Sequence, residues 1–353
     1  MLSLVLALAS LTQQVDSTRI VTSDIPNFWR AYDLAAGKDS AERVRIVETV
    51  YLQPGSPGLR DWIRVRLMNP DTVRARLVAA GWPKARLDSL PLDSVKKVIA
   101  PFYERSAAEQ LLGAVSKYPR YYAAVRPTTL SVDTNSRITQ GIRRGLQKLA
   151  ALYPEARFPT IYFLIGTLST GGTTAQSGML IGTEQSAGDP TTPLDELPDW
   201  ARKNMPNHRF EHLVVLVVHE AVHTQQKPMP AGQCDNLLRH ALGEGIADFL
   251  AELAVGPSAT KQPREIYGPA HEHDIWVDFQ DEMQGGDSTI RTWMYNGMVP
   301  EGQNHGAVDI GYWVGYRIAG AYYARAKDKR AAVRELLELH DPEAILRASG
   351  YAP

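Results

Sequence analysis

Two histidines and a glutamate stand at a spacing that suits a metal ion. Residues 210–226 read FEHLVVLVVHEAVHTQQ, an apolar helical pattern that carries His219, Glu220 and His223. Positions i and i+4 share one helix face, so both imidazoles can meet a single zinc ion at about 2.0–2.1 Å. Glu220 projects beside them, where it can take a proton from water and deliver it to a leaving amine. The motif predicts one zinc ion with Glu220 as general base.

A third ligand is predicted from the segment LGEGIAD, which holds Glu244 and Asp248. A catalytic zinc takes three protein ligands and leaves a fourth position for water. Glu244 follows His223 after enough chain for a loop and the start of a second, antiparallel helix. Asp248 lies one turn further on and can accept a hydrogen bond from a ligand imidazole. We expect Glu244 to bind the ion and Asp248 to orient a histidine.

Two alternatives stay open for this second segment. The two carboxylates can lie on a solvated helix face, although the apolar neighbours of Glu244 favour burial. His240, one turn before Glu244, is the rival third ligand, because imidazole suits zinc equally well. Gly243 and Gly245 would permit close packing against the first helix.

Composition excludes several other classes of protein. The 353 residues carry a formal net charge of -1, so no global field favours nucleic acid or anionic membranes. The single cysteine, Cys234, excludes a disulfide framework and a thiolate zinc site, and is expected to be a buried or bystander thiol. A hydrophobic content of 44% is enough for a sizeable core.

The N-terminus predicts export. The sequence begins MLSLVLALASLTQQ, an apolar run with an A-x-A pattern at Ala7 to Ala9, typical of a secretory signal over residues 1–18. No basic residue precedes the run, as one would in a usual signal peptide. The alternative is therefore a frayed N-terminal helix of the folded domain. No other stretch has the ~20 apolar residues of an integral membrane helix. A secreted or periplasmic location follows.

The elements that must position the motif change in character along the chain. Residues 19–153 form a predicted helical region, and residues 154–353 the predicted catalytic domain. In the latter, FPTIYFLI (158–165) and GMLIG (178–182) predict adjacent strands, and the Gly/Thr/Ser-rich segment between them predicts a turn or loop. Helical periodicity returns at four places, residues 210–226, 237–253, 312–326 and 331–339.

The order of these motifs resembles a known clan of enzymes. HExxH followed by ExxxD is similar to the gluzincin metallopeptidases, of which thermolysin-like enzymes are the best known. The longer series SGMLIG, VVHEAVHTQQ, GEGIADFLAE and IGYWVGYRIA resembles predicted zinc-dependent protease families that include the gliding-motility lipoprotein B group. The likeness covers roughly Pro159 to Tyr351.

The resemblance implies roles for particular residues. It implies His219, His223 and Glu244 as zinc ligands, and it implies that the strand before the motif helix binds substrate backbone as an added strand, here through Gly178, Met179 and Leu180. Two features depart from the pattern. Gly243 stands where gluzincins have Asn, and no lipobox cysteine lies near the N-terminus, so lipid anchoring is not expected.

A hydrolase also needs a donor for the developing oxyanion, commonly Tyr or His beside zinc. Tyr312, Tyr316 and His305 are the candidates, although the two tyrosines share a helix face that is equally typical of core packing. His271 and His273 form either a second metal site or, as we favour, a polar loop.

We therefore expect a mostly helical α+β protein with a zincin-like catalytic half. The expected activity is cleavage of amide bonds in a peptide or protein substrate by zinc-activated water. The alternatives are a non-catalytic zinc-binding envelope or scaffold protein, and a metal-free helical module in which the motif is coincidental.

Overall fold

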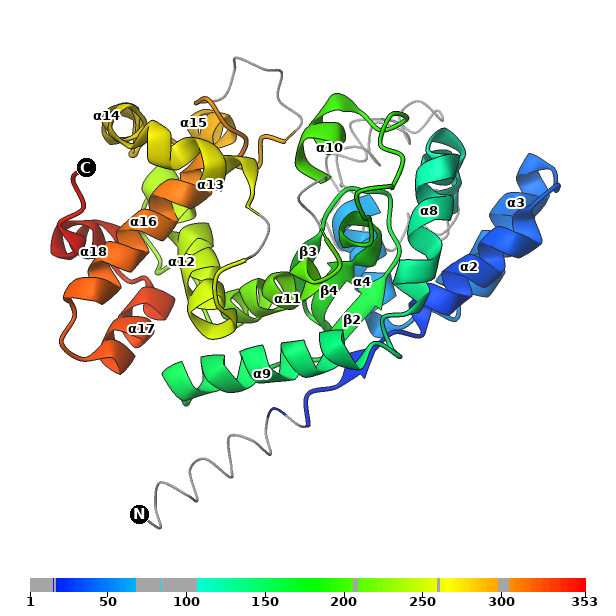
Figure 1. Ribbon diagram of the computed structural model, residues 1–353, viewed down its shortest axis with the longest axis horizontal. Helices are drawn as coiled ribbons and strands as arrows, with labels where there is room; N and C mark the ends of the chain where they lie inside the picture. Colours follow the sequence, from blue (N-terminus) through cyan, green and yellow to red (C-terminus); the bar gives the residue numbers. More distant parts are fainter. Residues whose placement is uncertain are drawn as a thin grey trace, which may run out of the picture. The chain divides into compact units, whose positions relative to one another are not determined.

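A computed structural model describes residues 17–67, 107–205, 209–258, 261–297 and 305–353, together with Val15 and Pro83. Most of the predicted signal segment, residues 1–14, lies outside these described residues. The described chain is mostly helical and contains one small sheet (Figure 1), which confirms the predicted α+β class.

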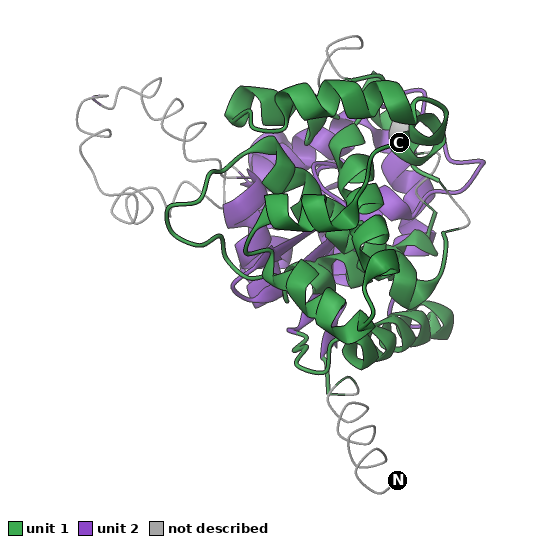
Figure 2. Cartoon of the chain, turned by 90° about the vertical axis from the view of Figure 1, so that its left-hand side faces the viewer, with its two compact units in different colours: residues 1–18, 135–158, 198–353 green, residues 19–134, 159–197 purple. Residues whose placement is uncertain are grey.

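The chain divides into two compact units, coloured separately in Figure 2. Unit 1 comprises Met1–Thr18, Asn135–Phe158 and Pro198–Pro353, and unit 2 comprises Arg19–Thr134 and Pro159–Leu197. This division differs from the predicted boundary at residue 154. The reason is pairing across the chain, because the strand that follows the boundary is hydrogen-bonded to a strand near the N-terminus.

Unit 2 contains the sheet, whose strand order is β1-β2-β4-β3. The strands are β1 (Ile20–Val21), β2 (Ile161–Leu164), β3 (Gly172–Ala175) and β4 (Gly178–Gly182). The first three in sheet order are parallel, and β3 pairs antiparallel to β4, with Thr174 opposite Met179. Strands β2 and β4 are buried throughout, as their continuous apolar sequences predict.

Strand β3 was not predicted, because its sequence GTTA lacks large apolar residues and the segment was expected to be a loop. It lies at the edge of the sheet and is only half-buried, so it needs no hydrophobic face. The helices of unit 2 are α2 (Asp24–Ala35), α3 (Ser40–Val47), α4 (Pro57–Trp62) and α8 (Pro119–Leu130), with π-helical turns at Glu48–Leu52 and Ile63–Leu67. Residues 107–117 are also helical.

A buried carboxyl group follows β4 in unit 2. Glu184 is 1% exposed and lies in the 3-10 turn Thr183–Ser186. Its Oε1 accepts a hydrogen bond from the backbone N–H of Leu168 at 3.1 Å, and among the described residues no donor reaches Oε2. Burial raises the pKa of Glu184 from 4.5 to about 7, although backbone N–H groups oppose the rise.

The raised pKa of Glu184 predicts a pH-dependent stability. The folded protein keeps a proton on Glu184 that the unfolded chain loses, so the free energy of unfolding should fall as pH rises between about 4.5 and 7. We expect the free energy of unfolding to fall by about 3 kcal/mol in total, with none of this stability lost below that window and all of it lost above. Denaturant unfolding at pH 5 and pH 8 tests this. The free energy of unfolding should change less between the two pH values in Glu184→Gln than in wild type, because the amide does not titrate. An equal difference in both proteins would contradict the prediction.

Unit 1 is built from helices. They are α9 (Ser136–Leu152), α10 (Asp199–Asn204), α11 (His212–His223), α12 (Leu237–Val255), α13 (Pro263–Tyr267), α14 (Glu272–Glu282), α15 (Asp287–Trp293), α16 (Ile310–Arg325), α17 (Lys329–Glu338) and α18 (Pro342–Ser349). The helices predicted at residues 210–226, 237–253, 312–326 and 331–339 are confirmed as α11, α12, α16 and α17. Within the described ranges, no helix combines the length and the apolar character needed to span a membrane.

Helix α12 is fixed at both ends by local sequence. The side chain of Asn236 accepts a hydrogen bond from the backbone N–H of Arg239 at 3.1 Å, which caps the first turn. Gly256 adopts φ 99° directly after the last turn, a conformation that favours glycine. These caps set the start and the end of the helix that carries Glu244 and Asp248.

Glycines let α12 approach α16 at backbone distance. A Cβ at Gly245 would lie 2.1 Å from the carbonyl carbon of Gly315, and a Cβ at Gly315 would lie 1.7 Å from the carbonyl oxygen of Ala241. The expectation that Gly243 and Gly245 pack against the motif helix is therefore wrong. Gly245 packs against α16, and a Cβ at Gly243 would meet no atom within 4 Å.

Candidate metal centre

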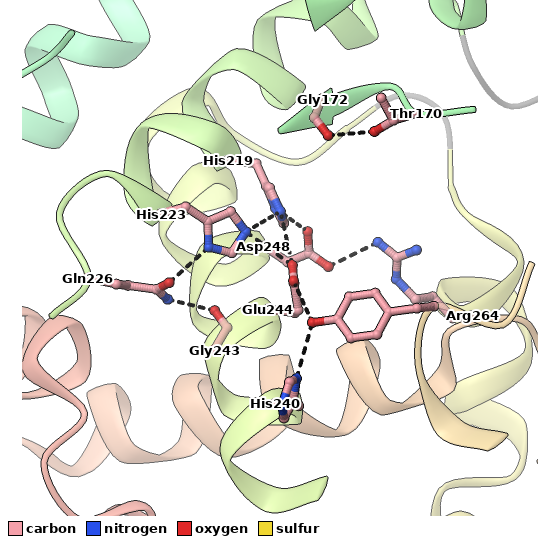
Figure 3. Close-up of polar contacts among 11 residues, drawn as sticks. Thr170, Gly172, His219, His223, Gln226, His240, Gly243, Glu244, Asp248 and Arg264 are labelled. Carbon is pink, nitrogen blue, oxygen red and sulfur yellow. Dashed lines mark hydrogen bonds and ion pairs between the residues drawn. The ribbon is translucent and has the colours of Figure 1, made fainter. Parts of the chain in front are cut away.

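Helices α11 and α12 bring three potential ligands together in unit 1 (Figure 3). His219 and His223 come from the last turns of α11, and Glu244 comes from α12. The three side chains are the only group among the described His, Cys, Asp and Glu residues with the geometry to hold a metal ion.

The ligand atoms form a nearly equilateral triangle. His219 Nε2 and His223 Nε2 lie 3.0 Å apart, and Glu244 Oε2 lies 3.1 Å from His223 Nε2 and 3.4 Å from His219 Nε2. Ligands of a tetrahedral zinc at 2.0–2.1 Å are separated by about 3.3 Å. The donor set and its spacing therefore fit a zinc ion.

A carboxylate fixes the orientation of His219. Its Nδ1 lies 2.8 Å from Asp248 Oδ1, so Nδ1 carries the hydrogen and Nε2 keeps its lone pair. Arg264 donates to the other carboxylate oxygen of Asp248 at 3.0 Å. Asp248 thus occupies the orienting position that the sequence predicts for it.

A glutamine fixes His223 in the same way. Nδ1 of His223 lies 2.8 Å from Gln226 Oε1, and Gln226 Nε2 donates to the backbone oxygen of Gly243 at 2.6 Å. The second bond identifies which end of the amide faces the imidazole, so Nε2 of His223 also keeps its lone pair. Without a bound cation, three acceptor lone pairs would face one another, an arrangement that a metal ion or a proton relieves.

The electrostatics of the site also favour a cation. Burial lowers the pKa of His219, but Asp248 and Glu244 outweigh it and raise the pKa to about 10. Burial raises the pKa of Glu244, but the two imidazoles hold it well below its usual range. A proton or a metal ion is therefore stabilised between the imidazoles and the carboxylates.

Glu220 is not part of the ligand triangle. Its side chain is 5% exposed, and its negative charge acts to raise the pKa values of both His219 and His223. The Glu220 carboxylate therefore lies near enough to both imidazoles for its charge to favour their protonated forms.

His240, the rival ligand, does not join the triangle. Its Nε2 lies 2.7 Å from Asp235 Oδ1, and its Nδ1 lies 3.4 Å from the hydroxyl of Tyr295. That hydroxyl donates to Glu244 Oε1 at 2.9 Å. Tyr295, Gln226 and Arg264 were missed from the sequence. Only Gln226 had a local signal, because it lies one turn after His223.

The expected oxyanion donors have other partners. The guanidinium carbon of Arg264 lies over the ring of Tyr312, 4.8 Å from its centroid. The rings of Tyr312 and Tyr295 meet edge-on, with their centroids 6.0 Å apart. The hydroxyl of Tyr316 donates to Glu252 at 3.0 Å. His305 stacks on Trp293 at 3.8 Å between centroids. None of these contacts is to a residue of the ligand triangle.

The remaining candidates of unit 1 lie apart from the ligand triangle. His271 precedes α14 and stacks on Tyr267, and His273 Nδ1 donates to the backbone oxygen of Pro353 at 3.1 Å. They form a helix start rather than the polar loop that we favoured, and in the described chain they belong to no second metal-binding group. Cys234 is exposed, so it is not the buried thiol that was one of two expectations.

The predicted substrate strand needs correction. Gly178, Met179 and Leu180 lie in β4, which is hydrogen-bonded to β2 on one side and to β3 on the other. All three residues are buried. No further strand can add to β4, so the predicted backbone contact with substrate is incompatible with the sheet order.

Fold and site define a mostly helical α+β protein with an HExxH-based cluster that has the geometry to hold a metal ion. A family model for gliding motility protein GldB matches residues 107–353, and the chain belongs to this family. The family model describes a lipoprotein, which fits a protein of the cell envelope. No curated protein and no solved structure matches the chain.

Proposed function

We propose that this chain is a zinc-dependent hydrolase that cleaves amide bonds in peptides. One zinc ion is held by His219, His223 and Glu244, and Glu220 is the general base. The zincin-like character of the fold, and an extracytoplasmic location in the cell envelope, are parts of the same proposal. The observation that carries it is the triangle of three acceptor atoms separated by 3.0, 3.1 and 3.4 Å.

The protein groups around the ion have separate tasks. Zinc supplies Lewis acidity, which polarises a carbonyl group and makes water more acidic. Glu220 takes the proton from the attacking water and returns it to the leaving nitrogen as the amide bond breaks. Asp248 and Gln226 keep the Nε2 atoms of the two imidazoles directed at the ion. The choice of a peptide substrate rests on the resemblance to gluzincin peptidases.

The alternative is a non-catalytic zinc-binding protein of the envelope, and the description of the family as a gliding motility protein is compatible with it. Two features favour the hydrolase. A purely structural site would close its fourth position, whereas the described residues supply three ligands, and a structural site has no need of a carboxylate such as Glu220.

Metal analysis and digestion of a peptide library test the proposal together. Purified wild-type protein should contain one zinc ion per chain and cleave the library, and His223→Ala should lower zinc affinity more than about 100-fold. We expect more than 100-fold because the loss of a residue that only hydrogen-bonds to a ligand already lowers metal affinity about 10–100-fold. Cleavage should disappear with the metal.

His273→Ala is the matched control, because among the described residues His273 lies outside the group that could hold a metal ion, and its Nδ1 is hydrogen-bonded to the backbone oxygen of Pro353. It should retain zinc and cleavage. Wild-type protein without stoichiometric zinc would exclude the proposal. If a chelator lowers the melting temperature but no substrate is ever cleaved, the non-catalytic alternative holds.

A further inference from the structure

Tyr295 occupies a strained position next to the proposed zinc site. Its φ is 55°, in the left-handed region that a residue with a Cβ enters at a cost of about 1–2 kcal/mol. Its side chain is also 55% exposed, so burial of the ring offers little compensation. Strain of this kind persists only where neighbouring contacts impose it, and it gathers at functional sites.

The neighbouring residue imposes the strain. The backbone N–H of Asn296 donates to Asp309 Oδ1 at 3.0 Å, and the backbone N–H of Asp309 donates back to Asn296 Oδ1 at 2.8 Å. The side-chain Nδ2 of Asn296 also donates to the backbone oxygen of Thr292 at 2.7 Å. Asn296 is 1% exposed and ties the segment to the start of α16. The position of Tyr295 is therefore built into the fold.

The two carboxylate oxygens of Glu244 have different partners, and the Tyr295 hydroxyl is one of them. It donates to Oε1 at 2.9 Å, while Oε2 faces the imidazole nitrogens of His223 and His219 at 3.1 and 3.4 Å. The tyrosine ring is held edge-on by His240 and Tyr312, each at 6.0 Å between centroids. One carboxylate oxygen is thus held away from the place where the ion fits.

We propose that Tyr295 is a positioning residue that restricts Glu244 to one-oxygen ligation of the metal. The inference rests on the proposed function, because it concerns the same site. A carboxylate bound through both oxygens would occupy the coordination position that a catalytic zinc keeps open for water and substrate. By engaging Oε1, the Tyr295 hydroxyl preserves that position.

Tyr295→Phe tests the inference, since it removes the hydroxyl and keeps the exposed ring. The variant and the wild-type protein are loaded with Co²⁺, whose visible absorption reports coordination number and geometry. We expect the variant to show the weaker absorption of a higher coordination number, because Glu244 is free to bind through both oxygens. Zinc affinity, measured by competition with a chelator, should weaken about 10–100-fold.

Tyr351→Phe is the matched control in the same unit, because the Tyr351 hydroxyl donates to the carboxylate of Glu272 at 2.8 Å. It should match wild type in both measurements. If the Co²⁺ spectrum of Tyr295→Phe equals that of wild type, the inference is overturned, whatever the zinc affinity of the variant. In that case the proposed function still stands, provided that the wild-type chain binds zinc. A wild-type chain that binds no metal overturns both.

Discussion

Glu220→Gln should reduce peptide hydrolysis about 10²–10⁴-fold, the usual contribution of general acid–base catalysis. The amide has nearly the shape of the carboxylate but cannot accept the proton of the attacking water. Because Glu220 stands outside the triangle of ligand atoms, the variant should still bind one zinc ion per chain. Initial rates on a peptide cleaved by wild type, together with zinc content, provide the measurement.

Glu211→Gln is the control for the Glu220 experiment. Glu211 is the exposed N-cap residue of the same helix, α11, so the chemical change is identical but lies at the opposite end from the ligands. It should keep full activity. Undiminished hydrolysis in Glu220→Gln would remove the general base from the mechanism. Loss of zinc from that variant would instead assign Glu220 to the ligand set.

Gly245→Ala should destabilise the protein by about 3 kcal/mol, at the upper end of the range for overpacking. The new methyl group would lie 2.1 Å from backbone atoms of Gly315 and Tyr316, and backbone cannot rotate away as a side chain can. Helices α12 and α16 must separate, which also displaces the neighbouring Glu244, the proposed ligand. We expect the denaturant midpoint and the zinc affinity to fall together.

Gly243→Ala lies two positions earlier on α12 and makes the same chemical change. A Cβ there would meet no atom within 4 Å, so the variant should be neutral or gain about 0.5–1 kcal/mol from the loss of glycine flexibility. The carbonyl that accepts from Gln226 is kept. Equal stabilities of the two alanine variants would show that the contact between α12 and α16 tolerates a methyl group.

Much of the site could be predicted because helix geometry is local. The i and i+4 spacing places His219 and His223 on one face whatever the rest of the fold, and the same rule aligns Glu244 with Asp248 on α12. Apolar periodicity also located the principal helices, and continuous apolar runs located the two buried strands, since each element's pattern reflects its own burial.

Other expectations failed where the outcome depends on distant residues. β4 was expected to bind substrate backbone as an added strand, but β3 pairs with it, and the GTTA sequence of β3 lacks the large apolar residues that predict a strand. Gly245 was expected to face α11 and instead faces α16. A glycine in a helix indicates that another helix can approach closely, and an apolar run indicates that a strand can form. Neither pattern identifies the partner element.

By itself, the sequence determined the helices and the spacing of the candidate ligands along them, and it predicted Glu220 as the general base, because these follow from spacing within single elements. Only the tertiary structure decided that Glu244 rather than His240 completes the triangle, and that Gln226 and Asp248 fix the two imidazoles. It alone placed the hydroxyl of Tyr295 on the second oxygen of Glu244. The physical reason is that these contacts join different segments, so they depend on how the helices pack and not on any local pattern.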